Sequence, residues 1–274
     1  MDKERLKKLN EFANQLRLDM LNMALRSGSN GAHLGGSLSS AEILTVLFNS
    51  ILKHDPKNPS WASRDRFILS KGHVSMAYYA ALCRAGYFSE EELMSFNSDG
   101  SQLLTHSLVN QEKGIEISSG SLGWGLSIGI GCALSAKKKN ESWRTYVLLG
   151  DGECNEGSVW EAFMAAARMK LNNLIAIIDC NGMQLDGVNA VMPPDKHCAM
   201  LDACGWEAVV VDGHDVTHLE EILAAKPEHK PYAVIAKTIK GKGVSFMENN
   251  ADWHHGRITA EQFETAVKEV KCDA

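Results

Sequence analysis

The chain has 274 residues, 45% of them hydrophobic and 23% charged, and a formal net charge of −6. This length and composition can fill one large core and are not those of a disordered protein. The acidic balance, with no basic cluster beyond the lysine run 137–139, argues against nucleic acid as a partner.

Seven cysteines without a Cys-x-x-Cys pair indicate reduced thiols rather than a disulfide framework or a zinc cage. Residues 1–5 begin a charged amphipathic helix instead of a signal peptide. No apolar stretch reaches the roughly 20 residues that a bilayer-spanning helix needs. We therefore expect a cytoplasmic protein with no membrane partner.

The predicted elements begin with helices. Residues 1 to about 60 are expected to be helical, except for segment 27–36, which is too rich in glycine for a helix. Ser37 or Ser39 is expected to restart a helix that continues through Phe48.

Short apolar runs and amphipathic segments alternate along the rest of the chain. The runs predicted as strands are 67–69, 145–149, 174–178, 208–211 and 233–236. Helices are predicted at 158–170, with Ser158 as the N-cap, and at about 259–270. Residues 184–200, which contain Pro193-Pro194, are expected to form an irregular loop. This alternation predicts an α/β fold, a doubly wound parallel sheet flanked by helices, in a single domain over residues 1–274.

Oxygen-bearing side chains follow two neighbouring predicted strands. Asp151 comes after strand 145–149, and Asn181 comes after strand 174–178. Because these strands and the helix between them form a β-α-β unit, both residues are expected at the carboxyl edge of the sheet, where ligands bind. A carboxylate, a carboxamide and a backbone carbonyl suit Mg²⁺, which shares its coordination with phosphate. We therefore predict a metal site made by Asp151, Asn181 and the carbonyl of Met183.

Glycines flank the predicted carboxylate ligand. Gly150 and Gly152 allow the backbone to approach a bulky anion, and the amides at the start of the following helix face negative charge. A plain strand-to-helix turn explains this loop about equally well when it is considered alone. The matching Asn181 one strand later favours a metal-bound diphosphate site.

Histidines at four places form a second group of candidate site residues. They are His33, His73, His106 and the pair His254-His255, and each lies in a loop or at the start of an element. A single loop histidine is usually a surface residue. Several near one predicted site suit proton transfer at neutral pH, because the unperturbed pKa of imidazole is about 6.5.

These motifs together resemble the thiamine-diphosphate fingerprint, and the best match is the N-terminal half of transketolases. The resemblance covers nearly the whole chain, including segments 65–73, 119–123 and 240–248. It implies that the cofactors are thiamine diphosphate and Mg²⁺. The cofactor contacts predicted on this basis are Gly150, Asp151, Gly152, Glu156, Asn181, Met183, Leu122 and Gly123.

The resemblance also implies roles for the histidines. Transketolases line their substrate funnel with histidines that bind sugar hydroxyls and relay protons, and His73 and His106 match two of them. His255 matches a third, although its neighbour His254 is an alternative.

Several positions depart from the commonest transketolase pattern. Ser29 stands where that pattern has histidine, and His33 stands where it has a second proline. The order His-Leu-Gly resembles the related 1-deoxyxylulose-5-phosphate synthases, so His33 is a candidate to replace the lost imidazole. Ser121 and Trp124 replace a usual proline and a usual glutamine, and Trp124 either re-lines the funnel or packs in a subunit interface. These departures leave the donor and acceptor sugars open.

The family also requires a glutamate from a pyrimidine-binding domain, which follows the region that this chain resembles. We therefore expect an N-terminal subunit of a two-chain transketolase, which moves a two-carbon ketol unit from a ketose phosphate to an aldose. A separate C-terminal, pyrimidine-binding subunit is expected to complete an α2β2 assembly. The alternatives are a subunit of another thiamine-dependent enzyme, similar to a 1-deoxyxylulose-5-phosphate synthase or a 2-oxoacid dehydrogenase alpha chain, and a non-catalytic paralogue.

Overall fold

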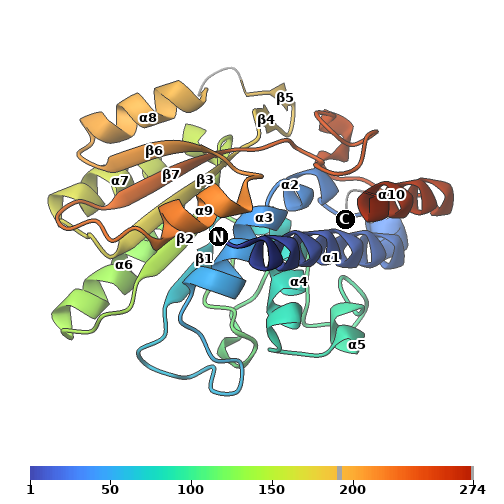
Figure 1. Cartoon of the computed structure of the whole chain (residues 1–274), viewed down its shortest axis with the longest axis horizontal. Coiled ribbons are helices and arrows are strands. Elements are labelled where there is room, and N and C mark those ends of the chain that lie inside the picture. Colours follow the sequence, from blue (N-terminus) through green and yellow to red (C-terminus); the bar gives the residue numbers. More distant parts are fainter. Residues whose placement is uncertain (190–192, 273–274) are drawn as a thin grey trace.

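The computed structural model, which describes residues 1–189 and 193–272, contains a five-stranded sheet (Figure 1). Its strand order is β1-β2-β3-β7-β6, and every neighbouring pair is parallel. The strands are β1 Arg66–Leu69, β2 Thr145–Gly150, β3 Leu174–Cys180, β6 Glu207–Asp212 and β7 Tyr232–Lys237. Each predicted strand is confirmed, and so is the predicted α/β fold with a parallel sheet.

Helices cover both faces of this sheet (Figure 1). Their bounds are α1 Lys3–Ser27, α2 Leu34–Leu38, α3 Ala41–Val46, α4 Ser75–Ala85, α5 Glu90–Leu93, α6 Gly125–Lys138, α7 Gly157–Arg168, α8 Pro194–Ala203, α9 Val216–Ala224 and α10 Ala260–Cys272. Within residues 1–189 and 193–272, none of these helices has the length and apolar character needed to cross a membrane.

Alternate residues of the central strand explain why both faces are apolar. In β3, Ile175 and Ile177 pack into the core formed with α1, α3, α4 and α9. Ala176 and Ile178 pack into the second core, which is formed with α6, α7 and α8. Because successive side chains of a strand point to opposite faces, a strand that is covered on both sides must be apolar throughout.

The glycine-rich segment after α1 is partly helical, so the prediction of a loop over residues 27–36 is wrong at its end. Helix α2 begins at Leu34 and contains Gly35 and Gly36. A Cβ on Gly35 would lie 2.9 Å from the carbonyl oxygen of Trp253, so this tight packing requires glycine there. The next helix, α3, has Ser40 as its N-cap rather than Ser37 or Ser39.

Helix α7 is shifted from its predicted bounds. Its N-cap is Glu156, because Ser158 lies inside the first turn and its hydroxyl donates to the carbonyl of Gly123. The helix ends at Arg168, and Lys170 has a φ of 52°, which a helix cannot continue.

The predicted irregular loop at residues 184–200 is also wrong in part. Strands β4 Met183–Gln184 and β5 Gly187–Val188 form an antiparallel hairpin, and α8 begins at Pro194. Proline is favoured at the first position of a helix, because a backbone N–H at that position has no acceptor within the helix and its absence costs no hydrogen bond. Positions 190–192 of this predicted loop lie outside the described residues.

Candidate functional site

A cavity of about 280 Å³ lies at the carboxyl ends of β2 and β3. Its lining residues are Lys71, His73, Leu122, Gly150, Asp151, Gly152, Glu153, Asn181, Met183, Gln184, Leu185, Asp186, Lys240 and His254. The structure therefore brings the two predicted strand-end ligands, Asp151 and Asn181, into one cavity.

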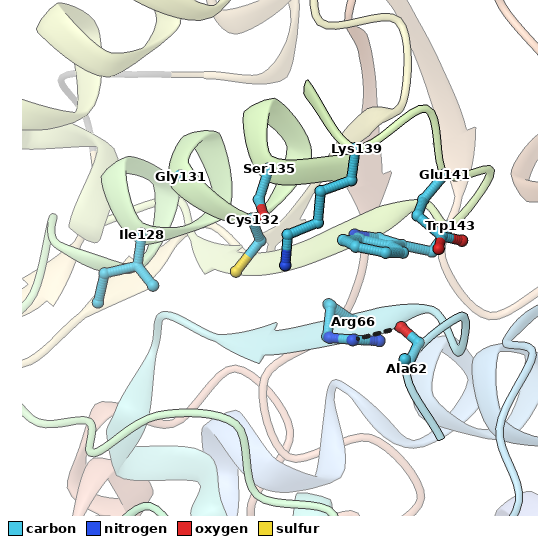
Figure 2. A pocket seen from close by; sticks show the side chains of 9 residues that line it. All are labelled: Ala62, Arg66, Ile128, Gly131, Cys132, Ser135, Lys139, Glu141 and Trp143. Atoms are coloured by element: carbon cyan, nitrogen blue, oxygen red, sulfur yellow. Dashed lines mark hydrogen bonds between the residues drawn. The ribbon is translucent and has the colours of Figure 1, made fainter. Parts of the chain in front are cut away.

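A larger cavity of about 600 Å³ lies between α6 and the segment before β1 (Figure 2). Its Arg66 donates to the carbonyl of Ala62 over 2.8 Å and lies over the ring of Trp143, with 4.9 Å from Cζ to the ring centre. This guanidinium is already engaged by protein groups, and none of the predicted site residues lines the cavity. The chemistry therefore favours the smaller cavity as the functional site.

Backbone N–H groups fix both predicted ligand side chains. Asp151 accepts from the N–H of Gly152 over 2.9 Å and from the N–H of Gly182 over 2.8 Å. Asn181 Oδ1 accepts from the N–H of Met183 over 3.1 Å. Burial, assisted by the nearby charge of Asp179, raises the pKa of Asp151 to about 6. A bound cation would favour the charged carboxylate and offset this cost of burial.

The donor set fits a hard cation. Among the described residues, no group of three or more His, Cys, Asp or Glu side chains could hold a metal. A metal here would therefore depend on mixed oxygen donors: the carboxylate of Asp151, the carboxamide of Asn181 and the carbonyl of Met183. Mg²⁺ accepts such a half-shell when phosphate and water complete it.

A buried ion pair, which was not predicted from the sequence, forms part of the cavity wall, because Lys71 lines the cavity. Lys71 follows β1 and pairs with Asp179 of β3, and both side chains are almost fully buried. Asp179 also accepts from the hydroxyls of Ser39, over 2.6 Å, and Thr238. Burial alone would raise the pKa of Asp179, but Lys71 and these hydroxyls hold it below its usual value. An acidic residue inside an otherwise apolar strand was the available signal, because such a charge requires a buried partner.

Glu153 is a second buried acid that was not predicted from the sequence. Its carboxylate accepts from the Ser70 hydroxyl, from the N–H of Gly123 over 2.9 Å and from the N–H of Gly150 over 3.0 Å. Burial raises its pKa. Glu153 thereby joins three loops and places Gly123 beside the loop of Asp151.

The five predicted histidines converge next to the cavity. The ring centre of His33 lies 5.4, 5.9, 5.6 and 4.5 Å from those of His73, His106, His254 and His255. Burial, followed by the neighbouring imidazoles, lowers the pKa of His33 to about 3. The Nδ1 atom of His33 is buried and has no hydrogen-bond partner among the described residues. His33 therefore presents a neutral imidazole with free bonding capacity at the centre of the cluster.

Lys240, which follows β7, adds a cation to the cavity. Its side chain is buried, and its Nζ lies 3.1 Å from Nδ1 of His254. Burial, and then the charge of Lys71, lowers the pKa of Lys240 to about 8. Of the histidine doublet, His254 lines the cavity, whereas His255 packs against His33.

Glu156 lies apart from the other predicted cofactor contacts. Its side chain is exposed at the N-cap of α7 and does not line the cavity. Gly123 is connected to the cavity through Glu153 rather than by lining it. The predicted cofactor contacts of both residues stay predictions.

Comparison with known proteins identifies the family. Residues 9–273 match the family described as transketolase, thiamine diphosphate binding domain. The chain belongs to this family. The resemblance to transketolases that the motifs predicted is therefore confirmed.

Two relatives of this transketolase domain are named as subunits. An apulose-4-phosphate transketolase subunit of Phocaeicola vulgatus is 42% identical over 241 residues, which cover 87% of this chain and 85% of that protein. The 6-deoxy-6-sulfo-D-fructose transketolase subunit SqwG of Clostridium sp. is 39% identical over 242 residues, with 87% and 88% covered.

A solved transketolase has the same fold. The structure from Campylobacter jejuni aligns with a TM-score of 0.90 and 32% identity over 99% of this chain. The chain spans only 43% of that transketolase. It is therefore a transketolase-type chain that corresponds to one part of the longer enzyme.

Proposed function

We propose that this chain is the N-terminal subunit of a two-chain transketolase. Residues 1–274 act as one domain that binds thiamine diphosphate and Mg²⁺. With a separate pyrimidine-binding subunit in an α2β2 assembly, it transfers a two-carbon ketol unit from a ketose phosphate to an aldose. The observation that carries this proposal is the convergence of Asp151, Asn181 and the histidine cluster on one cavity.

The metal and diphosphate are assigned to groups around the carboxyl ends of β2 and β3. Asp151, Asn181 and the carbonyl of Met183 hold Mg²⁺. Gly150, Gly152, Leu122, Gly123 and Glu156 are the proposed contacts to the cofactor. The ammonium of Lys240 offsets part of the negative charge of the diphosphate, because a cation in a dry cavity interacts strongly with an anion.

When bound, thiamine diphosphate supplies the carbon nucleophile that makes and breaks the ketol carbon–carbon bond. The chain's own histidines hold the sugar hydroxyls and move their protons. His33 is suited to bind a hydroxyl because it is neutral at pH 7 and its Nδ1 has no partner among the described residues. His73, His106, His254 and His255 surround the same space.

The names of the relatives support a partner chain. The aligned region covers 85% and 88% of the two matched subunits, so each is close in length to this chain. Leu122 and Trp124, which are 38% and 66% exposed, provide an apolar rim beside the cavity against which that partner would pack.

The test is an assay of ketol transfer from a ketose phosphate, with this chain alone and with its pyrimidine-binding partner. We expect activity only from the pair and only with thiamine diphosphate and Mg²⁺. Strong activity of the chain alone would contradict the two-chain proposal. Activity with pyruvate but not with a ketose phosphate would indicate a different thiamine-dependent reaction.

A further inference from the structure

His214 lies in the turn between β6 and α9, outside the cofactor cavity, yet its ring contacts the segment that carries Lys240. The N–H of Ile239 donates to Nε2 of His214 over 2.9 Å. Because a backbone N–H can only donate, Nε2 must hold a lone pair, and the proton of the neutral ring must be on Nδ1. Nδ1 lies 2.9 Å from Oε2 of Glu42, which accepts a hydrogen bond from the Nδ1–H group.

Glu42 is itself held in place. The carboxylate is 7% exposed, and its Oε1 accepts from Nη2 of Arg17 over 2.6 Å. Burial alone would raise the pKa of Glu42, but the charge of Arg17 and the hydrogen bond from His214 hold it below its usual value. The carboxylate is therefore charged and serves as a fixed acceptor for the ring of His214.

The same side chains hold the backbone on both sides of Lys240. Nε of Arg17 donates to the carbonyl of Lys242 over 3.1 Å, while His214 holds the residue before Lys240. Between these anchors, the N–H of Gly241 donates to the carbonyl of Gly35 over 2.9 Å. The turn has little freedom to move while these three bonds persist.

We propose that His214 is a positioning residue, which holds Ile239 and thereby fixes the ammonium of Lys240 in the cofactor cavity. The inference rests on the proposed function, in which Lys240 faces the diphosphate. Lys240 is 2% exposed and lines the cavity, whereas His214 does not line it. The influence of His214 on the cofactor must therefore pass through the backbone turn.

Two substitutions separate the two hydrogen bonds of His214. His214→Asn places an amide near the position of Nδ1, so it keeps the bond to Glu42 and leaves the N–H of Ile239 without an acceptor. His214→Gln reaches the position of Nε2 and keeps that acceptor. In the assembled two-chain enzyme with Mg²⁺, we expect the Kd for thiamine diphosphate to rise about tenfold for His214→Asn and less than about twofold for His214→Gln. His229→Asn is the control, because the side chain of His229 is 87% exposed.

A double-variant cycle tests whether His214 acts through Lys240. In a Lys240→Gln background, His214→Asn should produce no further loss of affinity, since the ammonium that it positions is gone. Additive losses in the double variant would overturn the inference. If His214→Asn does not fold, His214→Gln still tests the inference. A tenfold loss of affinity for thiamine diphosphate in His214→Gln, which keeps the acceptor for the N–H of Ile239, would also overturn the inference.

The outcomes distinguish this inference from the proposed function. A wild-type pair that binds no thiamine diphosphate overturns the proposed function and the inference with it. A wild-type pair that binds thiamine diphosphate, with unchanged affinity in folded His214→Asn, overturns only the role of His214.

Discussion

The charge of Asp151 has two opposing effects. It destabilises the chain without ligands, and it is proposed to bind the metal. Its carboxylate is buried beside Asp179, which raises its pKa to about 6, so the charged form is disfavoured. The same carboxylate is the only charged donor among the three proposed metal ligands. A residue that lowers the stability of the free chain is thus the one expected to contribute most to binding.

Asp151→Asn tests this opposition. We expect Mg²⁺-dependent binding of thiamine diphosphate to weaken by at least about 100-fold. Even the loss of a residue that only hydrogen-bonds to a metal ligand typically lowers metal affinity 10-fold to 100-fold. The melting temperature of the free chain should change little, because removal of the buried charge is offset by the hydrogen bond from Gly152 or Gly182 that the amide nitrogen of Asn cannot accept. Isothermal titration calorimetry and thermal unfolding measure the two effects. Asp99→Asn is the control, since Asp99 is an exposed loop residue, and unchanged affinity for Asp151→Asn would contradict the metal assignment.

The proximity of Asp151 and Asn181 was predictable because both follow parallel neighbouring strands in one β-α-β unit. The convergence of the histidines was predictable only from the family resemblance. Lys240 and Glu153 were not identified in advance, since a single lysine or glutamate in a loop carries no periodic signal. Their importance depends on burial and on partners far away in the sequence, which only the folded chain reveals.

At the scale of elements, helix α6 packs against β2 so closely that one position must be glycine. A Cβ on Gly129 would lie 2.6 Å from Cγ2 of Val147 and 3.3 Å from Cδ1 of Leu174. Gly131, on the same helix, has no atom within 4 Å of an added Cβ. The two glycines therefore provide a matched pair of positions, one tightly packed and one open, at which to test the packing of α6.

Gly129→Ala should lower the free energy of unfolding by roughly 1–2 kcal/mol, because the strain of overpacking exceeds the gain in helix propensity. Gly131→Ala should raise it by about 0.5–1 kcal/mol, since only the propensity changes. Denaturant titration of each variant measures both values. Equal effects at the two positions would contradict the close packing of α6 on β2.

Element positions were predictable to within two residues wherever hydrophobic periodicity was strong, as in the strands and in α7. The prediction failed at α2, where propensity alone disfavours Gly35 and Gly36 in a helix. There, tertiary contact with the segment of Trp253 outweighs local preference. It failed again at α8, where Pro193-Pro194 suggested a turn although proline is also a favoured first residue of a helix.

At the scale of the whole molecule, the chain buries several histidines in their neutral form. Burial lowers the pKa of His33 to about 3 and that of His197 to about 4, and it places that of His73 well below its usual value. His197 lies on α8, is fully buried and has no hydrogen-bond partner among the described residues. Because His197 lies far along the chain from the cluster around His33 and on a different helix layer, the effect of these histidines on stability is a property of the whole chain.

These values predict unusual sensitivity to acid. As the pH falls below about 6.5, these histidines become protonated in the unfolded chain but stay neutral in the folded chain. Each therefore lowers the free energy of unfolding by about 1.4 kcal/mol per pH unit. Burial also lowers the pKa of His254 to about 4, and four such histidines together give roughly 5.5 kcal/mol per pH unit. Asp151 acts in the opposite direction, since its raised pKa makes the folded chain take up a proton first between about pH 6 and pH 4, and burial raises the pKa of Glu153 as well, but two carboxylates supply at most about half of that slope.

The histidines therefore dominate, and the melting temperature of the free chain should fall steeply between about pH 6.5 and pH 5, well above the range in which carboxylates alone unfold a protein. Thermal unfolding followed by circular dichroism across this range measures the slope. His197→Leu removes one of these histidines without touching the cofactor cavity, so the pH dependence should become shallower by the share of one histidine, about 1.4 kcal/mol per pH unit. His229→Leu, at an exposed position, should leave the slope unchanged. A melting temperature that is constant down to about pH 5 would mean that these imidazoles become protonated inside the folded chain, and that the cluster around His33 is more hydrated than its burial indicates.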